Sequence, residues 1–184
     1  MKEIIFATQW WNRMGKKQEF LLFDPAEEEI TPDKIIFDFR RDNRFLSNYH
    51  LQNILVRGKL FPSSEHAYQA FKTHDSDWFK HIQSAESCKI AKQRGLNAPI
   101  RDDWEDVKYD IMMEVLSSKF SVPELATRLL KTGQAYLVEG NYWHDNTWGV
   151  CTMLDCPRCK GKIALNQLGE ILMIIRRSLQ LKGG

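Results

Sequence analysis

The pattern of apolar and polar positions along the chain changes character near Pro62. Before this proline, β-branched and aromatic residues predict strands at residues 35–39 and 54–57, the second turning through Gly58-Lys59 into Leu60-Phe61. After it, apolar residues recur at the three- and four-residue spacing of helices. This spacing predicts helices at residues 63–74, 77–84, 87–94, 102–120, 121–132 and 164–180, with one short strand at residues 135–138.

Capping residues set several of the predicted helix ends. Ser63 or Ser64 can cap the first helix, and Gly95 is expected to end the third. Asp102 is expected to cap the longest helix, with Glu105 reaching back from its first turn. Strands and helices do not alternate as they do in a doubly wound sheet. The predicted fold class is therefore α+β and predominantly helical, a single compact domain with a small β element near the N-terminus.

The composition is typical of one globular domain, because 43% of the 184 residues are hydrophobic and 27% are charged. We expect residues 35–184 to form this domain, and residues 1–34 to be an extension that packs on it or flanks it. A net charge of +2 does not indicate a nucleic-acid-binding protein, but it is compatible with a local basic groove. The chain has no apolar run of about 18 residues and no signal-peptide pattern, so the predicted location is cytoplasmic.

The helix predicted after Pro62 has one polar face. That face carries a carboxylate, a phenol, an amide and an amine, from Glu65, Tyr68, Gln69 and Lys72. Such a stripe can line a cleft. The alternative is a solvated face whose acid-to-base order favours the helix.

Lys119 interrupts the apolar stripe of the longest predicted helix. A buried ammonium group is costly unless it is paired or deprotonated. The side chain can instead carry its head to water along its apolar stem. The functional alternative is an amine with a lowered pKa, suited to attack C1 of a sugar or to hold a phosphate.

Residues 139–149 concentrate indole, carboxylate and imidazole side chains in a predicted loop. Loops presented by a rigid scaffold often carry function, and a carboxylate can stabilise an oxocarbenium-like centre or activate water. The structural alternative is that Trp143 and Trp148 anchor the loop to the core while Asp145 caps a turn.

Three of the four cysteines lie within nine residues, and a histidine precedes them by seven. This spacing can supply three thiolates and one imidazole to a structural zinc ion, from His144, Cys151, Cys156 and Cys159. A single Cys-x-x-Cys is a weak signal, so a loop with incidental thiols is the alternative. In either case we expect the cysteines to be structural or incidental and not catalytic.

Several motifs occur together in a recognisable order. The first two are Phe45-Leu46-Ser47-Asn48-Tyr49 and the run from Ser63-Ser64-Glu65-His66 to Phe71-Lys72. Further matches are Ala91-Lys92, Arg101-Asp102-Asp103-Trp104, Met112-Met113, Lys119-Phe120, Thr132-Gly133, Leu137-Val138-Glu139, residues 145–149 and residues 166–173. On these motifs the chain resembles the NADAR/YbiA-like family of N-glycosidases. Residues 1–34 and 151–160 lie outside the resemblance.

The resemblance implies a compact, helix-rich, YbiA-like fold and hydrolysis of N-glycosidic bonds. Members of this family act on phosphoribosylamino intermediates of riboflavin synthesis, or remove ADP-ribose attached to guanine bases. The implied substrate is a ribose phosphate or ADP-ribose group, on a small molecule or on a nucleic acid. This chemistry requires no cofactor and no membrane, and a structural zinc ion is an additional possibility.

The residues expected to catalyse the reaction are Glu65, Asp145, Lys119 and Lys72. One carboxylate would activate the nucleophile, and the other would stabilise positive charge at C1 of the sugar. A lysine would either bind phosphate or form a Schiff base, with Lys119 preferred for the imine and Lys72, beside Glu65, for phosphate. The residues expected to bind substrate are Phe45, Ser47, Asn48, Tyr49, Gln69, Arg101, Trp104, Trp148 and Gly149.

Two other classes of function compete with this prediction. A non-catalytic module that binds ADP-ribose or NAD would keep the Ser47-Asn48 turn and the tryptophans but could lose the carboxylates. The presence of Glu65 and Asp145 therefore favours an enzyme. A zinc-stabilised interaction protein is the third class, and it depends only on the cysteine cluster.

Overall fold

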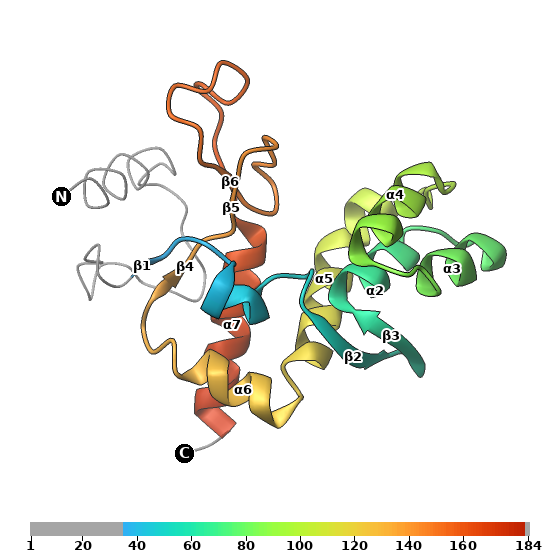
Figure 1. Cartoon of the computed structure of the whole chain (residues 1–184), viewed down its shortest axis with the longest axis horizontal. Helices are drawn as coiled ribbons and strands as arrows, with labels where there is room; N and C mark the ends of the chain where they lie inside the picture. The colour runs from blue at the N-terminus through green and yellow to red at the C-terminus, as the bar shows by residue number, and fades with distance from the viewer. Residues whose placement is uncertain (1–34, 183–184) are drawn as a thin grey trace. The chain divides into compact units, whose positions relative to one another are not determined.

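The computed structural model describes residues 35–182, from strand β1 to helix α7 (Figure 1). The predicted extension at residues 1–34 lies outside the described residues. Helices dominate, and the described strands pair only two at a time, so the predicted helix-rich α+β class is confirmed. The chain divides into two compact units, one formed by residues 40–130 and one by the segments on either side of them.

The central unit begins with a short helix and a hairpin and continues as five helices. Its elements are η2 (Arg41–Leu46), β2 (Leu51–Val56), β3 (Lys59–Ser63), α2 (Ser64–Ala70), α3 (Ser76–Gln83), α4 (Cys88–Asn97), α5 (Trp104–Lys119) and α6 (Pro123–Leu130). Strands β2 and β3 are antiparallel, with Ile54 opposite Phe61. Arg57 and Gly58 turn the hairpin with φ values of 50° and 72°, which suit the twist of a two-residue turn.

Helix α2 lies at the centre of this unit, where it contacts α3, α4, α5 and the hairpin (Figure 1). All seven of its residues are buried, polar ones included. At the C-terminal end of α2, the rings of Phe61, Phe71 and Phe79 pack with centroids 5.5–5.9 Å apart and interplanar angles of 53–73°. Aromatic packing of this kind adds stability beyond the buried area, so it helps to fix the end of α2.

Several helix boundaries differ from the predictions, among them the end of α4, the start of α5 and the end of α2. Gly95 lies inside α4 and does not end it. Helix α5 begins at Trp104 and has no side-chain cap, so the predicted capping box of Asp102 and Glu105 is wrong. Helix α2 ends at Ala70, four residues early, because the chain turns after Phe71.

The second unit joins residues 35–39 to residues 131–182. Strand β1 (Ile35–Ile36) runs parallel to β4 (Tyr136–Leu137), and β5 (Gly140–Asn141) runs parallel to β6 (Val150–Cys151). Helix α7 (Gln167–Lys182) packs beside β4. No helix within residues 35–182 is both long and apolar enough to cross a membrane.

One asparagine fixes the start of α7 in this unit. Asn166 has a φ of 52°, and its side chain donates to the Leu137 carbonyl and accepts from the Glu139 N–H. A Cβ at Gly169 would lie 2.1 Å from the same Leu137 carbonyl oxygen. The first turn of α7 therefore approaches β4 closely only because residue 169 has no side chain.

Candidate functional site

Glu65 lies in the buried first turn of α2, and its side chain has defined partners. Ser63 caps the helix by accepting from the His66 N–H, and the Glu65 N–H donates to the Asn48 carbonyl over 3.1 Å. The Gln69 amide donates to the Glu65 carboxylate over 2.8 Å. Only 6% of Glu65 is exposed. The interpretation of the polar stripe as a solvated helix face is therefore wrong.

Gly95 allows Gln69 to occupy this position, and the sequence analysis missed that role. A Cβ at residue 95 would lie 2.3 Å from the Gln69 side-chain oxygen and 2.9 Å from its Cβ. Helices α2 and α4 can thus approach each other only with glycine at this point. A glycine inside an otherwise helical pattern was the available signal, since such a residue often marks a close packing contact.

Lys119 is buried together with its charged end. Its exposed fraction is 1%, and its Nζ donates to the Ser47 carbonyl over 2.8 Å. The interpretation that the lysine carries its head to water is therefore wrong. Asn48, which follows Ser47, donates from its side-chain amide to the sulfur of Met112 over 3.4 Å. Met112 and Lys119 both belong to helix α5. The Ser47-Asn48 turn is thus fixed to α5 on one side and to α2 on the other.

Lys72 follows α2 and lies beside two aromatic rings. Its Nζ is 5.4 Å from the Tyr68 ring centroid and 5.7 Å from that of Trp104, and these two rings are 5.1 Å apart. Burial lowers the pKa of Lys72, the charge of Glu65 opposes this shift, and Lys92 adds to it. The sequence suggested that Glu65 would keep this amine charged, but burial has the larger effect.

Two further groups respond to the charge of Glu65. Burial raises the pKa of Tyr49, and the Glu65 carboxylate raises it further. Burial also raises the pKa of Cys88, whose sulfur lies 3.2 Å from the Ser63 hydroxyl, with a smaller contribution from Glu65. The carboxylate therefore shares one local environment with Tyr49, Lys72 and Cys88.

Three buried polar atoms in this environment have no hydrogen-bond partner within the described residues. They are Asn48 Oδ1, Ser64 Oγ and Gln69 Oε1. An unsatisfied buried polar atom costs free energy, and such atoms are few in folded proteins. All three belong to the Ser47-Asn48 turn or to α2, the elements that surround Glu65.

Two of the predicted binding residues already have partners. The guanidinium of Arg101 binds both carboxylate oxygens of Asp103, with 2.7 Å between Nη2 and Oδ2. The backbone N–H of Arg101 donates to the Lys72 carbonyl. Phe45 is buried against Phe120 with ring centroids 6.5 Å apart, and the Arg128 guanidinium lies 4.1 Å from its ring centroid. Phe45 therefore supports the core of the central unit.

Asp145 belongs to the second unit, where its side chain closes a turn. One carboxylate oxygen accepts from the N–H groups of Thr147 and Trp148, both over 2.9 Å. The side chain of Asn141 bridges the Asp145 backbone, donating to its carbonyl and accepting from its N–H. These hydrogen bonds match the predicted turn-capping role. A Cβ at Gly149 would lie 2.2 Å from the Glu139 carbonyl oxygen, so this glycine permits the loop to close.

The two tryptophans of this loop differ. Trp143 is 51% exposed and packs edge-on against Tyr142, which is 52% exposed, so the expectation that Trp143 anchors the loop to the core is wrong. Trp148 is partly buried.

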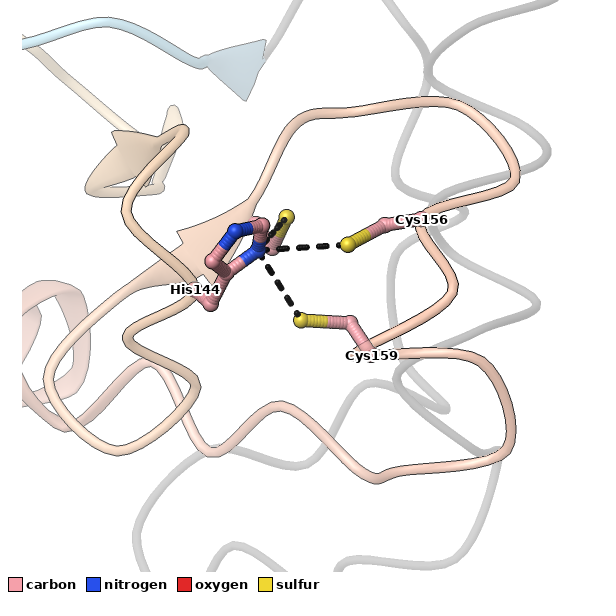
Figure 2. Close-up of side chains that lie close together, drawn as sticks. His144, Cys156 and Cys159 are labelled. Atoms are coloured by element: carbon pink, nitrogen blue, oxygen red, sulfur yellow. Dashed lines mark hydrogen bonds between the residues drawn. The ribbon is translucent and has the colours of Figure 1, made fainter.

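The histidine and three cysteines of the loop come together. Figure 2 shows the sulfur atoms of Cys156 and Cys159 turned toward the His144 imidazole. The distances from His144 Nδ1 to the sulfurs of Cys151, Cys156 and Cys159 are 3.6, 3.2 and 3.8 Å. All three sulfurs are buried free thiols, and the four ligand atoms lie within 4.8 Å of one another. This group could bind a metal ion.

The comparisons with known proteins agree with the helix-rich fold. The NADAR domain family model matches residues 32–180, and the chain belongs to this family. N-glycosidase YbiA of Shigella boydii is 37% identical over 160 residues, which cover 84% of this chain and 94% of that protein. A riboflavin biosynthesis protein of Vibrio vulnificus is 36% identical over 164 residues, covering 87% of this chain and 42% of that protein.

A solved structure supports the same family. The NMR structure of the Escherichia coli protein YbiA matches with a TM-score of 0.68 at 33% identity, covering 82% of this chain and 88% of that one. The predicted family is therefore confirmed. The comparisons do not test the individual site residues, which stay predictions.

Proposed function

We propose that this chain is an N-glycosidase whose central unit holds the reacting sugar beside Glu65. The class of activity is supported by the relatives, since those of Shigella and of Nostoc punctiforme are named N-glycosidases. The observation that carries the assignment to Glu65 is its burial on α2 with a fixed amide partner. A buried carboxylate that is oriented by its neighbours suits proton transfer or charge stabilisation better than a solvated one does.

The proposed substrate is a base or aminopyrimidine linked to a phosphorylated ribose or to ADP-ribose. Ribose hydroxyls donate hydrogen bonds, and the unpartnered oxygens of Asn48 and Gln69 are acceptors. Lys72 lies over the Tyr68 and Trp104 rings, so a substrate that reaches its amine would contact aromatic surface as well. Stacking on such surface favours a flat base.

The proposed reaction breaks the bond between C1 and the base nitrogen. In the direct route, Glu65 takes a proton from water as the water oxygen bonds to C1, and the base leaves with the electron pair and gains a proton. In the covalent route, a lysine amine bonds to C1 as the base leaves, and ring opening gives an imine that water hydrolyses. Both routes build positive charge at C1, which a carboxylate stabilises.

Lys72 is the better candidate for the covalent route. Imine formation requires a neutral amine, and burial lowers the pKa of Lys72. Lys119 instead uses its Nζ to hold the Ser47 carbonyl, so we propose that it positions the Ser47-Asn48 turn. This proposal reverses the order of the two lysines expected from the sequence.

The test is incubation of the full chain with four compounds: guanine-ADP-ribosylated DNA, NAD, ADP-ribose and a phosphoribosylamino-pyrimidine. Chromatography should detect a released base or aminopyrimidine from at least one of them, and no release by Glu65→Gln. Release from none, combined with saturable calorimetric binding of ADP-ribose, would replace the enzyme by the non-catalytic binding module.

A further inference from the structure

The group formed by His144, Cys151, Cys156 and Cys159 has the dimensions of a metal site. A zinc ion bound tetrahedrally has Zn–S distances of about 2.3 Å and Zn–N distances of about 2.0–2.1 Å. From these lengths, neighbouring nitrogen and sulfur ligands lie about 3.6 Å apart, and two sulfur ligands lie about 3.8 Å apart. The three Nδ1–Sγ distances of 3.2–3.8 Å bracket the expected nitrogen–sulfur edge.

The chemistry of the four groups selects among metals. Thiolates combined with one imidazole favour zinc over magnesium, calcium or manganese, which prefer oxygen ligands. Within the described residues, the cluster consists of one imidazole and three thiols and includes no carboxylate. Four protein ligands fill a tetrahedral shell, so no position is left for water or substrate. The cluster therefore has the composition of a structural site.

The backbone around the cysteines forms a tight turn. The N–H groups of Cys159 and Lys160 donate to the Cys156 carbonyl over 3.1 and 2.9 Å, and the Lys162 N–H donates to the Cys159 carbonyl over 3.0 Å. These hydrogen bonds hold Cys156 and Cys159 in one compact turn. The turn is completed by Asp155 and Gly161, with φ values of 50° and 76°.

We propose that His144, Cys151, Cys156 and Cys159 bind one zinc ion that fixes the loop of residues 144–151. His144 begins this loop and Cys151 ends it, so the ion joins its two ends. Between them, the Cys151 N–H donates to the Asn146 side chain over 3.2 Å. The ion thereby holds the Asp145 turn in place without taking part in chemistry. This proposal is independent of the proposed glycosidase activity.

The test measures metal on the full chain, purified with a reducing agent and without a histidine tag. Elemental analysis should give about one zinc per chain, as four protein ligands for one ion require. Replacement by cobalt(II) should give the visible absorption of tetrahedral cobalt and a thiolate-to-cobalt charge-transfer band. Removal of the ion by a chelator should lower the melting temperature, and zinc should restore it.

Variants identify the ligands. Cys159→Ser should lose the zinc, while Cys88→Ser, which changes a buried free cysteine on α4, should retain it. His144→Cys should retain zinc through four thiolates and His144→Ala should not. Both variants have a β-carbon at residue 144, where φ is 67°. A difference in zinc content between them therefore cannot come from backbone strain.

The proposal has clear contrary outcomes. A wild-type chain that holds no zinc and gives no thiolate band with cobalt would overturn it, whatever the variants do. Full zinc content in Cys159→Ser would overturn the ligand set. If Cys159→Ser does not fold, the cobalt spectrum of the wild-type chain decides alone.

Discussion

Two polar regions of this protein are built in different ways. On α2, Glu65 and Gln69 are fixed by long-range packing, with Gly95 from α4 pressed against the amide. In the loop of residues 141–149, Asp145 is fixed by hydrogen bonds to residues at most four positions away. The first arrangement leaves polar atoms buried without partners, whereas in the second the Asp145 side chain has backbone donors. We therefore propose that the α2 region binds the substrate, whereas the hydrogen bonds of Asp145 stabilise the loop.

The largest expected effect in this comparison follows from Glu65→Gln. The amide keeps the shape of the carboxylate but loses its charge and basicity, so we expect kcat to fall by roughly 10²–10⁴-fold, the usual range for acid–base groups. The melting temperature should change little, because the new side chain can still accept from Gln69. Glu86→Gln, which alters an exposed carboxylate on the same unit, is the control and should be fully active. Wild-type kcat in a folded Glu65→Gln protein would remove Glu65 from the mechanism.

The second effect concerns the lysines. Borohydride added during turnover should trap a sugar adduct on Lys72, and the yield should rise with pH. Burial lowers the pKa of Lys72, and a lysine is charged below its pKa. Raising the pH therefore increases the neutral fraction of the amine, which is the form that attacks C1. Lys72→Arg keeps the charge but cannot form the imine, so it should be inactive and give no adduct. Mass spectrometry of the trapped protein locates the adduct.

Lys119→Arg supplies the contrast for this experiment. A guanidinium does not fit the position of an amine that is 1% exposed, so the melting temperature should fall while the adduct on Lys72 persists. An adduct on Lys119 would restore the order expected from the sequence. Absence of any adduct, with activity in both arginine variants, would leave direct attack by water.

Gly95→Ala should have a smaller effect, and mainly on stability. The new Cβ would overlap the Gln69 side chain, and overpacking of this kind costs about 1–3 kcal/mol. Displacement of Gln69 also releases its hydrogen bond to Glu65, so kcat should fall with stability. Leu96→Ala, on the same helix but 67% exposed, should change neither. Urea denaturation measures the first effect, and an unchanged unfolding midpoint in Gly95→Ala would contradict it.

The smallest effect is expected at Asp145. Asp145→Ala removes the acceptor of two N–H groups and should cost about 1 kcal/mol, the usual net value of a hydrogen bond. Asp145→Asn keeps an acceptor and should restore the stability. If Asp145 only caps the turn, the asparagine variant is also active. A stable but inactive Asp145→Asn protein would instead support the predicted catalytic carboxylate.

The sequence predicted most helices of the described chain because their apolar spacing is regular. It could not place their ends where other side-chain contacts compete with local capping. The helix predicted to start at Asp102 begins at Trp104, and the carboxylate of Asp103 before it binds Arg101 instead of a backbone N–H of α5. Gly95 lies inside α4, where it makes room for Gln69 of α2. Helical spacing identified the stripe of Glu65 and Gln69, but not its burial. The contacts that bury it come from α3, α4 and α5, which no local pattern reveals.

The residues of the candidate site were visible in the sequence as motifs, but the long-range contacts between them were not. Motif resemblance indicated Ser47, Asn48 and Lys119, and the structure joins them through the Lys119–Ser47 and Asn48–Met112 hydrogen bonds. The role of Met112 was not visible, since a methionine in an apolar stripe has no polar signal. The cysteine cluster was visible from its spacing alone, because its ligands lie close in sequence.

The parallel pairing of β1 with β4 has a consequence for how the chain folds. Ile35 contacts Tyr136 only after the whole central unit has been synthesised. Closing so long a loop is entropically costly and slow, whereas the contacts of residues 40–130 are comparatively local. During synthesis on a ribosome, the central unit can therefore acquire its structure first, and the segment ending at Phe39 must wait for its partner strand. Mutations that weaken β4 should then delay the last phase of refolding and leave the earlier phase unchanged.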